Sequence, residues 1–277
     1  MGPSAHGTGP TPTHSLIFLC PSSSSGGLVV VSVNPPHPQA RLAIPGLQSQ
    51  ARFGLRILNP DGSEAEKSGN GLRIFARHLH DQGLLPAGSS ATVWTLGGVT
   101  TCSVGTDPAR TVTVDMGTVT FPDGPAGRRL EVKGRLYTVH AADIGNPHCV
   151  VPLPVISAAA AKDAGPVLET HPHFLPAKTN VQFLRVIDRS TIALEIWERG
   201  AGYTLASGSS ASASVAVARR LGLCDRNVTV RMPGGVLAVT VGDDFAVTIA
   251  SPVTLVSLRM RFSPQAYDFE LPLAGKL

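Results

Sequence analysis

Two serines, Ser68 and Ser207, stand 139 positions apart, and each opens a stretch of helix-compatible sequence. The stretches begin Ser68-Gly69-Asn70-Gly71 and Ser207-Gly208-Ser209-Ser210 and end at Gly83 and Gly222. A glycine at the end of such a stretch is typical of a helix C-terminus. The free backbone N–H groups at a helix start bind anions and stabilise negative charge. Two equivalent helix starts therefore predict two equivalent half-sites.

A plain structural role is the alternative for both serines. A serine before a helix commonly accepts a hydrogen bond from a backbone N–H of the first turn, and this alone explains its position. Proton transfer would require more, because a serine hydroxyl is a weak acid that needs a neighbouring base. The residues around the two serines must decide between these roles.

The similarity between the two halves of the chain extends beyond the serines. Nine residues before each serine stands a polar residue, Asn59 in the first half and Glu198 in the second, and both lead into a turn that contains glycine. After each helix comes a Gly-Gly pair, at 97–98 and 234–235, and then an alternating run, at 111–115 and 245–249. We infer an internal duplication of about half the chain, too long for a solenoid repeat and suited to two similar domains.

Composition and local pattern predict an α+β fold that is rich in strands. The chain has 277 residues, of which 43% are hydrophobic and 15% charged, with 29 Gly and 23 Pro. Short runs rich in Val and Thr between these residues favour strands joined by tight turns, and we expect strands at 15–19, 28–33 and 53–58. The spacing of Leu72, Phe75 and Leu79 is that of a buried helix face. The second helix is small and apolar almost all round, so we expect strands to wrap it.

We predict two pseudo-symmetric domains, 1–125 and 126–277, with the last ~15 residues of the second free to return to the first. The segment 122–127, with its proline and glycines, is the best candidate for the linker. A short helix is expected to begin within 158–162. Pro152 and Pro154 argue against a central strand at that point.

Charge and cysteine usage exclude several classes of function. The net charge is +4 and the basic residues are scattered, so nucleic acid is not an expected partner. No apolar run is long enough for a membrane span, and the first residues lack the features of a signal peptide. The four cysteines lie far apart, which favours a reducing cytoplasm. His78/His80 and His171/His173 lack a third ligand, so no metal site is predicted.

Five short motifs, in register, resemble those of the diaminopimelate epimerase family. They are Asn59-Pro60-Asp61-Gly62-Ser63-Glu64 with Ser68-Gly69-Asn70-Gly71, then Gly145-Asn146-Pro147-His148, Thr179-Asn180-Val181, Glu198-Arg199-Gly200-Ala201-Gly202 and Ser207-Gly208-Ser209. The resemblance covers the chain from about Phe53 onward. It implies two pseudo-symmetric domains, each a strand-rich barrel around a central helix, which coincides with the duplication. It also implies catalysis without pyridoxal phosphate, metal or any other cofactor.

The resemblance further implies roles for single residues. To invert an α-carbon, one group removes its proton from one face and another delivers a proton to the opposite face. The family uses two cysteines for this, at the positions of Ser68 and Ser207. The residues that would bind the reacting carboxylate and amine are Gly69, Asn70, Gly208 and Ser209. Those that would hold the far end of the substrate are Asn59, Asn180, Glu198 and Arg199, while Asn146 and His148 would lie beside the site.

The sequence departs from the family pattern at several positions. Serine stands at both cysteine positions, and near the start of the chain only one part of the family's motif is present. The other departures are Ile74 for a further cysteine, Tyr203 for a glutamate, Ser210 for a glycine, and His6-Gly7-Thr8-Gly9 followed by Pro10 for the N-terminal motif, with Gln48 or Gln50 as candidates for a binding glutamine.

The sequence therefore predicts a cofactor-independent amino-acid epimerase, most simply one that converts LL- to meso-diaminopimelate in lysine biosynthesis by two-base proton transfer. Two alternatives stay open: a related isomerase or dehydratase acting at the α-proton of another acid, and a non-catalytic descendant that binds a small molecule. Because both thiols are absent, the sequence alone leaves open whether the chain is an enzyme. The expected partner is an amino-acid substrate, and a homodimer is an open possibility.

Overall fold

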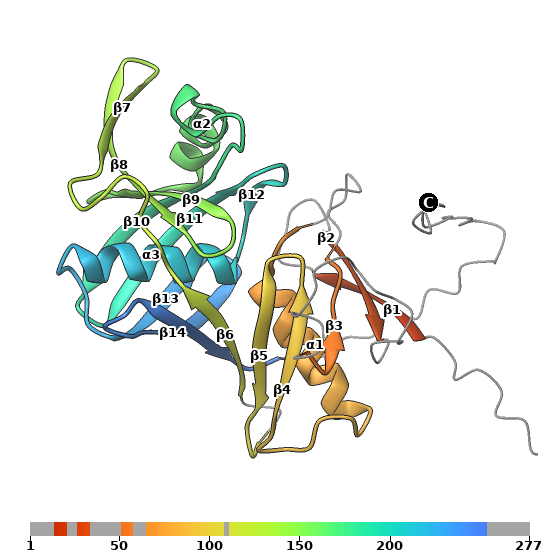
Figure 1. The fold of residues 1–277 in the computed structure, drawn as a ribbon. Coiled ribbons are helices and arrows are strands. Elements are labelled where there is room, and N and C mark those ends of the chain that lie inside the picture. Colours follow the sequence, from red (N-terminus) through yellow and green to blue (C-terminus); the bar gives the residue numbers. More distant parts are fainter. Residues whose placement is uncertain (1–13, 21–26, 34–50, 58–64, 108–110, 254–277) are drawn as a thin grey trace, which may run out of the picture.

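The computed structural model describes residues 14–20, 27–33, 51–57, 65–107 and 111–253, and Figure 1 shows the fold. The elements of the first half are β1 (His14–Cys20), β2 (Gly27–Val33), β3 (Phe53–Gly54), α1 (Gly69–Asp81), β4 (Ser90–Thr95), β5 (Gly98–Val104) and β6 (Val112–Thr118). The strands expected at 15–19 and 28–33 are confirmed as β1 and β2, which pair with each other alone. The strand expected at 53–58 is confirmed only for Phe53–Gly54, and the last residue of the expected range lies outside the described residues.

The second half contains two α-helices that pack on opposite faces of the sheet. Its elements are β7 (Arg128–Val132), β8 (Arg135–Asp143), β9 (Pro147–Pro152), α2 (Ala158–Glu169), η2 (Pro172–Phe174), β10 (Asn180–Asp188), β11 (Thr191–Glu198), β12 (Gly202–Thr204), α3 (Gly208–Arg220), β13 (Asn227–Met232), β14 (Gly235–Val241) and β15 (Ala246–Ser251). The α+β class predicted from the sequence is confirmed. The helix expected to begin within 158–162 is α2, and it runs further than that segment.

All described strands from β3 onward belong to one 13-stranded sheet. Its order is β3-β4-β5-β6-β15-β14-β13-β11-β10-β9-β8-β7, with β12 paired to β11. The two halves join where β15 pairs antiparallel with β6. Residues 122–127 were expected to link two domains, but the strands before and after this segment belong to the same sheet. A division into domains at 125/126 stays a prediction, and residues 263–277, which were expected to return to the first domain, lie outside the described part of the chain.

Backbone hydrogen bonds repeat with the same offset of 139 residues at both ends of α1 and α3. At the starts, the Leu72 and Ala211 N–H groups donate to the carbonyls of Ser68 and Ser207. At the ends, the Leu84 N–H donates to Leu79, as Leu223 does to Ala218. Each Gly-Gly pair lies in the tight turn of an antiparallel hairpin, β4–β5 and β13–β14. The inferred duplication therefore has a structural counterpart.

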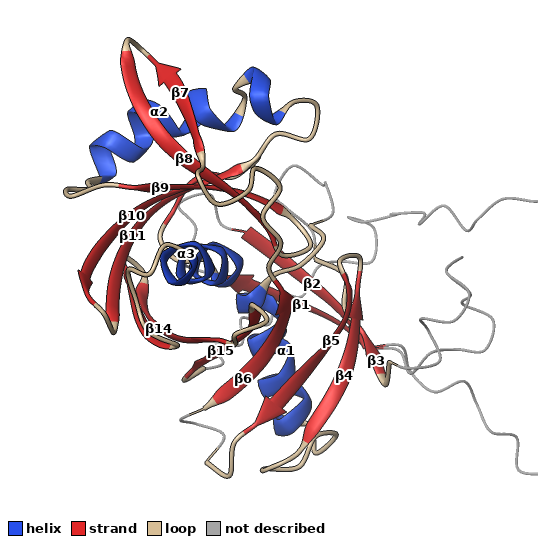
Figure 2. Ribbon diagram, turned by 60° about the vertical axis from the view of Figure 1, so that its left-hand side comes forward, coloured by secondary structure: helices blue, strands red, loops and turns tan. Residues whose placement is uncertain are grey.

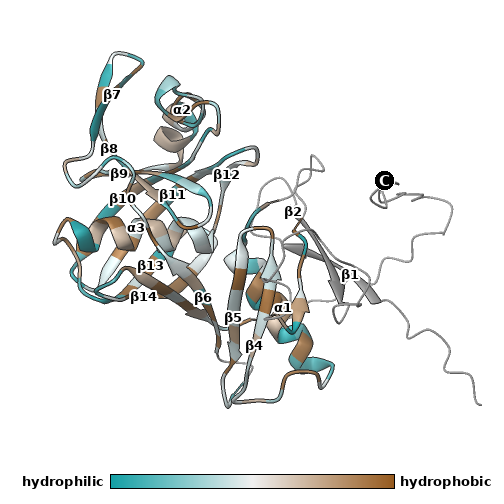
Figure 3. Cartoon of the chain, in the orientation of Figure 1, coloured by the Kyte–Doolittle hydropathy of each residue, from teal (hydrophilic) through white to brown (hydrophobic). Residues whose placement is uncertain are grey.

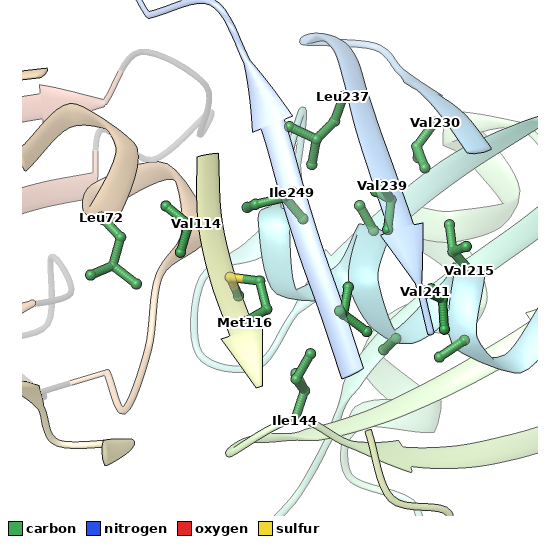
Figure 4. Packing of buried hydrophobic residues seen from close by; sticks show 14 of the residues in the cluster. Leu72, Val114, Met116, Ile144, Val215, Val230, Leu237, Val239, Val241 and Ile249 are labelled. Carbon is green, nitrogen blue, oxygen red and sulfur yellow. The ribbon is translucent and has the colours of Figure 1, made fainter. Parts of the chain in front are cut away.

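Strands curve around α3, which Figure 2 shows almost end-on. Every residue from Gly208 to Ala218 is buried, because small side chains let the helix approach the surrounding strands on all sides. Helix α1 instead buries one face, which includes Leu72, Phe75 and Leu79 as the spacing predicts. One hydrophobic core reaches both helices across β6 and β15, and Figure 4 shows Leu72, Met116, Ile249 and Val215 within it.

A second, smaller core lies between α2 and the opposite face of β10 and β11. Leu168 and Phe183 belong to it, and Gly165 packs directly on Trp197, where a β-carbon on the glycine would lie 2.6 Å from the ring. The expectation that Pro152 cannot lie in a central strand is wrong, because β9 runs between β8 and β10 and ends at this residue. Pro152 is tolerated there because it pairs only with Leu184 of β10, whereas the pairing with β8 ends at Val150.

Hydropathy follows this arrangement. Figure 3 shows hydrophobic residues concentrated in β13 and β14, which pack against α3, and hydrophilic residues along β7 and part of α2. In the part of the chain that the structure describes, no helix has the length and apolar character required to cross a bilayer.

Candidate active site

Ser68 and Ser207 are the N-cap residues of α1 and α3. Both have extended backbones, with φ −137° and ψ 113° at Ser68 and φ −145° and ψ 129° at Ser207. Each Oγ accepts a hydrogen bond from the N–H three residues on, at 3.1 Å from Gly71 and at 3.3 Å from Ser210. Each serine thus satisfies one of the N–H groups that a helix start leaves free. Capping explains their position, and their chemistry depends on the remaining neighbours.

The two helix starts meet at Gly69 and Gly208. A β-carbon on Gly69 would lie 3.1 Å from the Gly208 Cα and 2.6 Å from Cδ1 of Ile249. A β-carbon on Gly208 would lie 2.9 Å from the Gly69 Cα. Only glycine at both positions permits this approach of backbone to backbone. The contact brings the positive ends of two helix dipoles together, and such a pair of ends attracts an anion.

Asn70 joins the two helix starts. Its Nδ2 donates a hydrogen bond to the carbonyl of Ala206 at 3.1 Å, and its Oδ1 accepts one from Nη2 of Arg73 at 2.6 Å. Because Ala206 directly precedes Ser207, the Asn70 side chain crosses from α1 to the loop that carries the second serine. In the structure Asn70 links the two helix starts, and its assignment to the reacting head group stays a prediction.

Ser207 has a carboxylate partner. Its hydroxyl donates a hydrogen bond to Glu198, and the Thr204 hydroxyl donates to Oε2 of the same carboxylate at 3.1 Å. The Oγ of Ser207 also lies 3.4 Å from that of Ser209. Burial raises the pKa of Glu198, and the two hydroxyl hydrogen bonds lower it in part. A carboxylate with a raised pKa is a stronger base than an ordinary one, so Glu198 can take the Ser207 proton.

Ser68 lies in a different environment. Among the described residues its side chain has one hydrogen bond, from Gly71, and no carboxylate contacts it. The residue 139 positions before Glu198 is Asn59, which lies outside the described residues. Ser68 is half-buried, whereas Ser207 is 5% exposed. The two half-sites are therefore alike in backbone geometry and unlike in proton chemistry.

Arg199 links the second half of the chain to the first. Its Nη2 lies 2.9 and 3.0 Å from the two carboxylate oxygens of Glu66, and its Nη1 donates to the carbonyl of Ala177 at 3.0 Å. Its backbone N–H donates to Oδ1 of Asn180 at 3.0 Å, and Asn180 Nδ2 donates to the Pro147 carbonyl at 2.9 Å. Asn180 therefore holds the loop that contains Arg199 and the loop that contains Pro147 together. The positive charge at this point is that of the Arg199 guanidinium.

His148 is buried beside these loops as a neutral imidazole. Burial lowers its pKa to about 3, and the nearby Arg199 charge adds to the decrease, while Gln182 opposes it. The Nε2 of His148 lies 3.0 Å from Oδ1 of Asn146. Gln182 in turn donates from Nε2 to the Ser210 hydroxyl at 3.1 Å, so this polar group reaches the first turn of α3.

Three of these residues escaped the sequence reasoning: Glu66, Lys67 and Gln182. Lys67 directly precedes Ser68 and is buried, and its Nζ donates to the carbonyl of Met116 at 2.9 Å. Burial lowers the pKa of Lys67, and the Asp115 carboxylate opposes that effect. A signal existed for Gln182, which is two positions after Asn180 on one strand and so shares its face. Glu66 gave none, because its partner is 133 positions away.

Tyr203 does not belong to the site. It pairs with Trp197 across β11 and β12, and its hydroxyl donates to Oε2 of Glu195 at 2.6 Å. Lys162 of α2 lies over its ring, at 4.7 Å from the centroid. This is the sheet face covered by α2, and Glu198 and Thr204 lie on the other face because side chains alternate along a strand. The Tyr203 side chain therefore lies on the face of the sheet away from the Glu198 carboxylate.

The described cysteines do not replace the missing thiols. Cys102, Cys149 and Cys224 are free and buried, and they lie on β5, on β9 and after α3. Burial raises the pKa of Cys102 to about 12 and that of Cys224 to about 11, and it raises the pKa of Cys149 as well. Thiols with such pKa values stay protonated and unreactive at neutral pH.

Several predicted features fall outside the described residues. They are Asn59, the segment His6 to Pro10, and the candidate glutamines Gln48 and Gln50. Within the described ranges, no three or more His, Cys, Asp or Glu side chains gather as metal ligands would.

The family model described as diaminopimelate epimerase matches residues 41–122 and 140–255. A protein named diaminopimelate epimerase 2 from Nostoc sp. is 48% identical over 220 residues, which are 76% of this chain and 76% of that protein. A diaminopimelate epimerase from Desulfitobacterium hafniense is 39% identical over 227 residues, covering 78% of this chain and 79% of the relative.

Solved structures share the fold at low sequence identity. A hydroxyproline epimerase from Agrobacterium vitis with bound trans-4-hydroxy-L-proline has a TM-score of 0.59 at 16% identity, covering 74% of this chain and 69% of the other. A phenazine biosynthesis protein of the PhzF family from Bacillus anthracis has a TM-score of 0.56 at 15% identity, covering 87% and 94%. At these identities the likeness concerns the fold alone.

Proposed function

The chain belongs to the diaminopimelate epimerase family, and we propose that it inverts the α-carbon of an amino acid with Ser68 and Ser207 as the two proton-transferring groups. The observation that carries this proposal is the pairing of the two N-cap serines across the Gly69–Gly208 contact, with a carboxylate on one of them. An inverting site needs one proton-transferring group for each face of the substrate, and this arrangement supplies two.

The positive helix ends make proton removal possible. When the α-proton leaves, negative charge develops on the α-carbon and its carboxylate, and N–H groups fixed in advance stabilise that charge. Gly69, Asn70, Gly208 and Ser209 form the first turns of the two helices and are the residues that would bind the reacting head group. In this proposal both helix starts point at the same carboxylate.

Ser207 and Glu198 form the base. A serine hydroxyl cannot be held as an alkoxide at neutral pH in the way that a helix start holds a thiolate. In our proposal, the Ser207 Oγ takes the α-proton while its own proton passes to the Glu198 carboxylate. The Cα–H bond breaks, the α-proton ends on the Ser207 oxygen, and the former hydroxyl proton of Ser207 ends on Glu198.

Ser68 delivers the proton on the opposite face. Its hydroxyl gives a proton to the planar α-carbon and takes one from solvent, which its half-buried position allows. In the direction from the LL to the meso epimer, Ser207 thus acts as the base and Ser68 as the acid, because only Ser207 has a described carboxylate partner. The substrate is most simply LL-diaminopimelate, whose far end would be held by Asn59, Asn180 and Arg199, with Asn146 and His148 beside the site. Glu198, which the resemblance assigns to the far end, acts on Ser207 in this proposal.

Alanine variants of three N-cap serines test this function. LL-diaminopimelate is incubated with the parent chain and with Ser68→Ala, Ser207→Ala and Ser157→Ala, and the meso product is measured by chiral chromatography. Ser157 is the matched control, because its Oγ caps α2 in the same way, at 3.2 Å from the Ala160 N–H, away from both helix starts. We expect product from the parent and from Ser157→Ala only.

Equal loss of activity in all three variants would attribute the effect to capping and contradict the assigned roles. No product with the parent, together with measurable binding of the amino acid, would favour a binding protein. Product from another acid but none from diaminopimelate would favour the related α-proton isomerase.

A further inference from the structure

Glu169, the last residue of α2, carries a buried carboxylate that binds two neutral N–H groups. The residue is 8% exposed. Its Oε2 accepts a hydrogen bond from the indole Nε1 of Trp197 at 2.7 Å, and its Oε1 accepts one from the backbone N–H of Gly200 at 3.2 Å. Burying a charge costs free energy, so packing alone does not call for a carboxylate at this position.

The two partners of this carboxylate are both donors, and this decides which side chain can hold them. A carboxylate offers an acceptor oxygen to each N–H, whereas the amide of a glutamine offers one oxygen and one NH₂ group. With glutamine at position 169, the NH₂ group would face one of the two N–H groups and that contact would be lost. An ionised glutamate is therefore suited to hold Trp197 and Gly200 at the same time.

The two contacts of Glu169 lie on either side of Glu198. Trp197 directly precedes Glu198 and packs against α2, where it meets Gly165. Because side chains alternate along a strand, Glu198 lies on the other face, toward α3. Gly200 follows Glu198 by two positions. Glu169 thus holds the chain before and after Glu198 from behind the sheet.

Backbone pairing alone holds Glu198 weakly. Strand β11 pairs with β10 as far as Trp197, which lies opposite Val181. Glu198 itself pairs with Gly202 of β12, a strand of three residues. Beyond Trp197, β10 reaches the chain through the Asn180 side chain, which accepts a hydrogen bond from the N–H that follows Glu198. The contacts of Glu169 add support at the point where the ladder with β10 ends.

We propose that Glu169 is a positioning residue for Glu198: acting from the opposite face of the sheet, through Trp197 and Gly200, it keeps the Glu198 carboxylate against the Ser207 hydroxyl. This inference rests on the proposed function, in which Glu198 accepts the Ser207 proton. A small change in the direction of the strand end would lengthen that hydrogen bond and let water reach the carboxylate. The effect of Glu169 should therefore appear in the properties of Glu198.

Urea denaturation tests this coupling without any need for activity. Burial raises the pKa of Glu198, so Glu198→Gln should raise the urea midpoint of the parent at neutral pH. In a Glu169→Gln background the strand end relaxes and water reaches Glu198, so that gain should be lost. In a Glu131→Gln background the gain should persist. Glu131 is an exposed glutamate on β7, and this control covers the loss of one negative charge.

Kinetics test the same coupling in the proposed reaction. Initial rates of diaminopimelate epimerisation give kcat, KM and the pH profile of kcat/KM for each variant. We expect Glu169→Gln to lower kcat about tenfold, as loss of one charged hydrogen bond would, and to leave KM close to the parent value. The acidic limb of the profile should move toward the ordinary glutamate pKa of ~4.3, because a solvated Glu198 loses the effect of burial.

Two further variants separate positioning from packing. Trp197→Phe removes the indole donor and should move kcat and the acidic limb in the same direction as Glu169→Gln. Leu168→Ala is the control for packing, because Leu168 precedes Glu169 and is buried in the same core between α2 and the sheet. It should lower the urea midpoint and leave both the acidic limb and the gain from Glu198→Gln at parent values.

Several outcomes would overturn the inference: no gain from Glu198→Gln in the parent, an equal gain in the Glu169→Gln background, an unmoved acidic limb, or the same changes in Leu168→Ala. If Glu169→Gln does not fold, Trp197→Phe takes its place and the same outcomes decide. A gain that Glu169→Gln removes, in a parent that does not epimerise, would contradict the proposed function alone. Epimerisation by the parent, with a gain insensitive to position 169, would contradict the role of Glu169 alone.

Discussion

Gly69 and Gly208 pack against each other at the starts of α1 and α3, so that the Gly69 Cα lies 2.9 Å from the point where a residue at 208 would carry its β-carbon. The atoms around this point are backbone atoms and the end of Ile249, and backbone cannot move aside cheaply. The distance between Ser68 and Ser207 depends on this contact.

Gly208→Ala should therefore destabilise the protein by ~1–3 kcal/mol through overpacking, although alanine favours helix elsewhere. Chemical denaturation measures the change. Gly54→Ala is the control, because a β-carbon there would meet nothing within 4 Å. A Gly208→Ala variant as stable as Gly54→Ala would show that the helix starts do not touch in solution.

Glu198→Gln should be more stable than the parent at neutral pH. The pKa of Glu198 is raised in the folded state, so the folded chain binds this proton more tightly than the unfolded chain does. Its contribution is then favourable at pH below the unfolded value of ~4.3 and is lost as pH rises through the folded pKa. The advantage of the variant, measured by urea denaturation, should shrink as pH falls to about 4.

The same substitution should abolish most catalysis. Removing a general base typically costs a factor on the order of 10²–10⁴ in rate. Glu131→Gln should leave both stability and rate at parent values. A Glu198→Gln variant that keeps the parent rate would exclude Glu198 as the proton acceptor of Ser207.

His148 should make the protein less stable as the medium becomes acidic. Its pKa is about 3 in the folded state against ~6.5 in an unfolded chain, so the unfolded chain binds the proton first. The stability linked to His148 is complete above pH ~6.5 and is lost as pH falls toward 3. Comparing urea midpoints of the parent and His148→Gln across this range measures the effect. Parallel pH profiles would show that His148 is not buried as a neutral group.

Local sequence predicted much of this arrangement. The 139-residue offset between Ser68 and Ser207 predicted two matched helix starts, and backbone hydrogen bonds at that offset accompany them at both ends of the helices. Helix caps and glycine stops act within one turn, so they can be recognised from neighbouring residues.

Long-range contacts were not accessible in this way. The ion pair of Glu66 with Arg199 depends on how the halves join through β6 and β15, and no local pattern encodes it. Tyr203 shows a second reason. Its pairing with Trp197 decides which face of the sheet its side chain occupies. Tyr203, which departs from the family pattern, therefore lies on the face away from Glu198. The roles assigned to the site residues, the cytoplasmic location and the homodimer stay predictions.

Restoring thiols should accelerate the reaction. In a Ser68→Cys, Ser207→Cys double variant, the helix starts would lower the pKa of each thiol below its usual ~8.5 and hold it as a thiolate. We expect faster epimerisation of diaminopimelate than in the parent, and smaller gains in each single variant, because inversion needs a competent group on both faces. Initial rates of meso product measure this. A double variant no faster than the parent would show that the acid–base strength of the groups at 68 and 207 does not limit the rate.

Exchange of the α-proton with deuterated water tests the central claim most directly, because it reports proton removal whatever product forms. Diaminopimelate is followed by NMR with the parent, Ser68→Ala and Ser207→Ala. The parent should incorporate deuterium with inversion. Ser68→Ala should still exchange the proton that faces Ser207, without inversion, since the Ser207–Glu198 base remains. Ser207→Ala should exchange neither epimer. Exchange that survives in Ser207→Ala, or fails in the parent, would contradict proton transfer by these two serines.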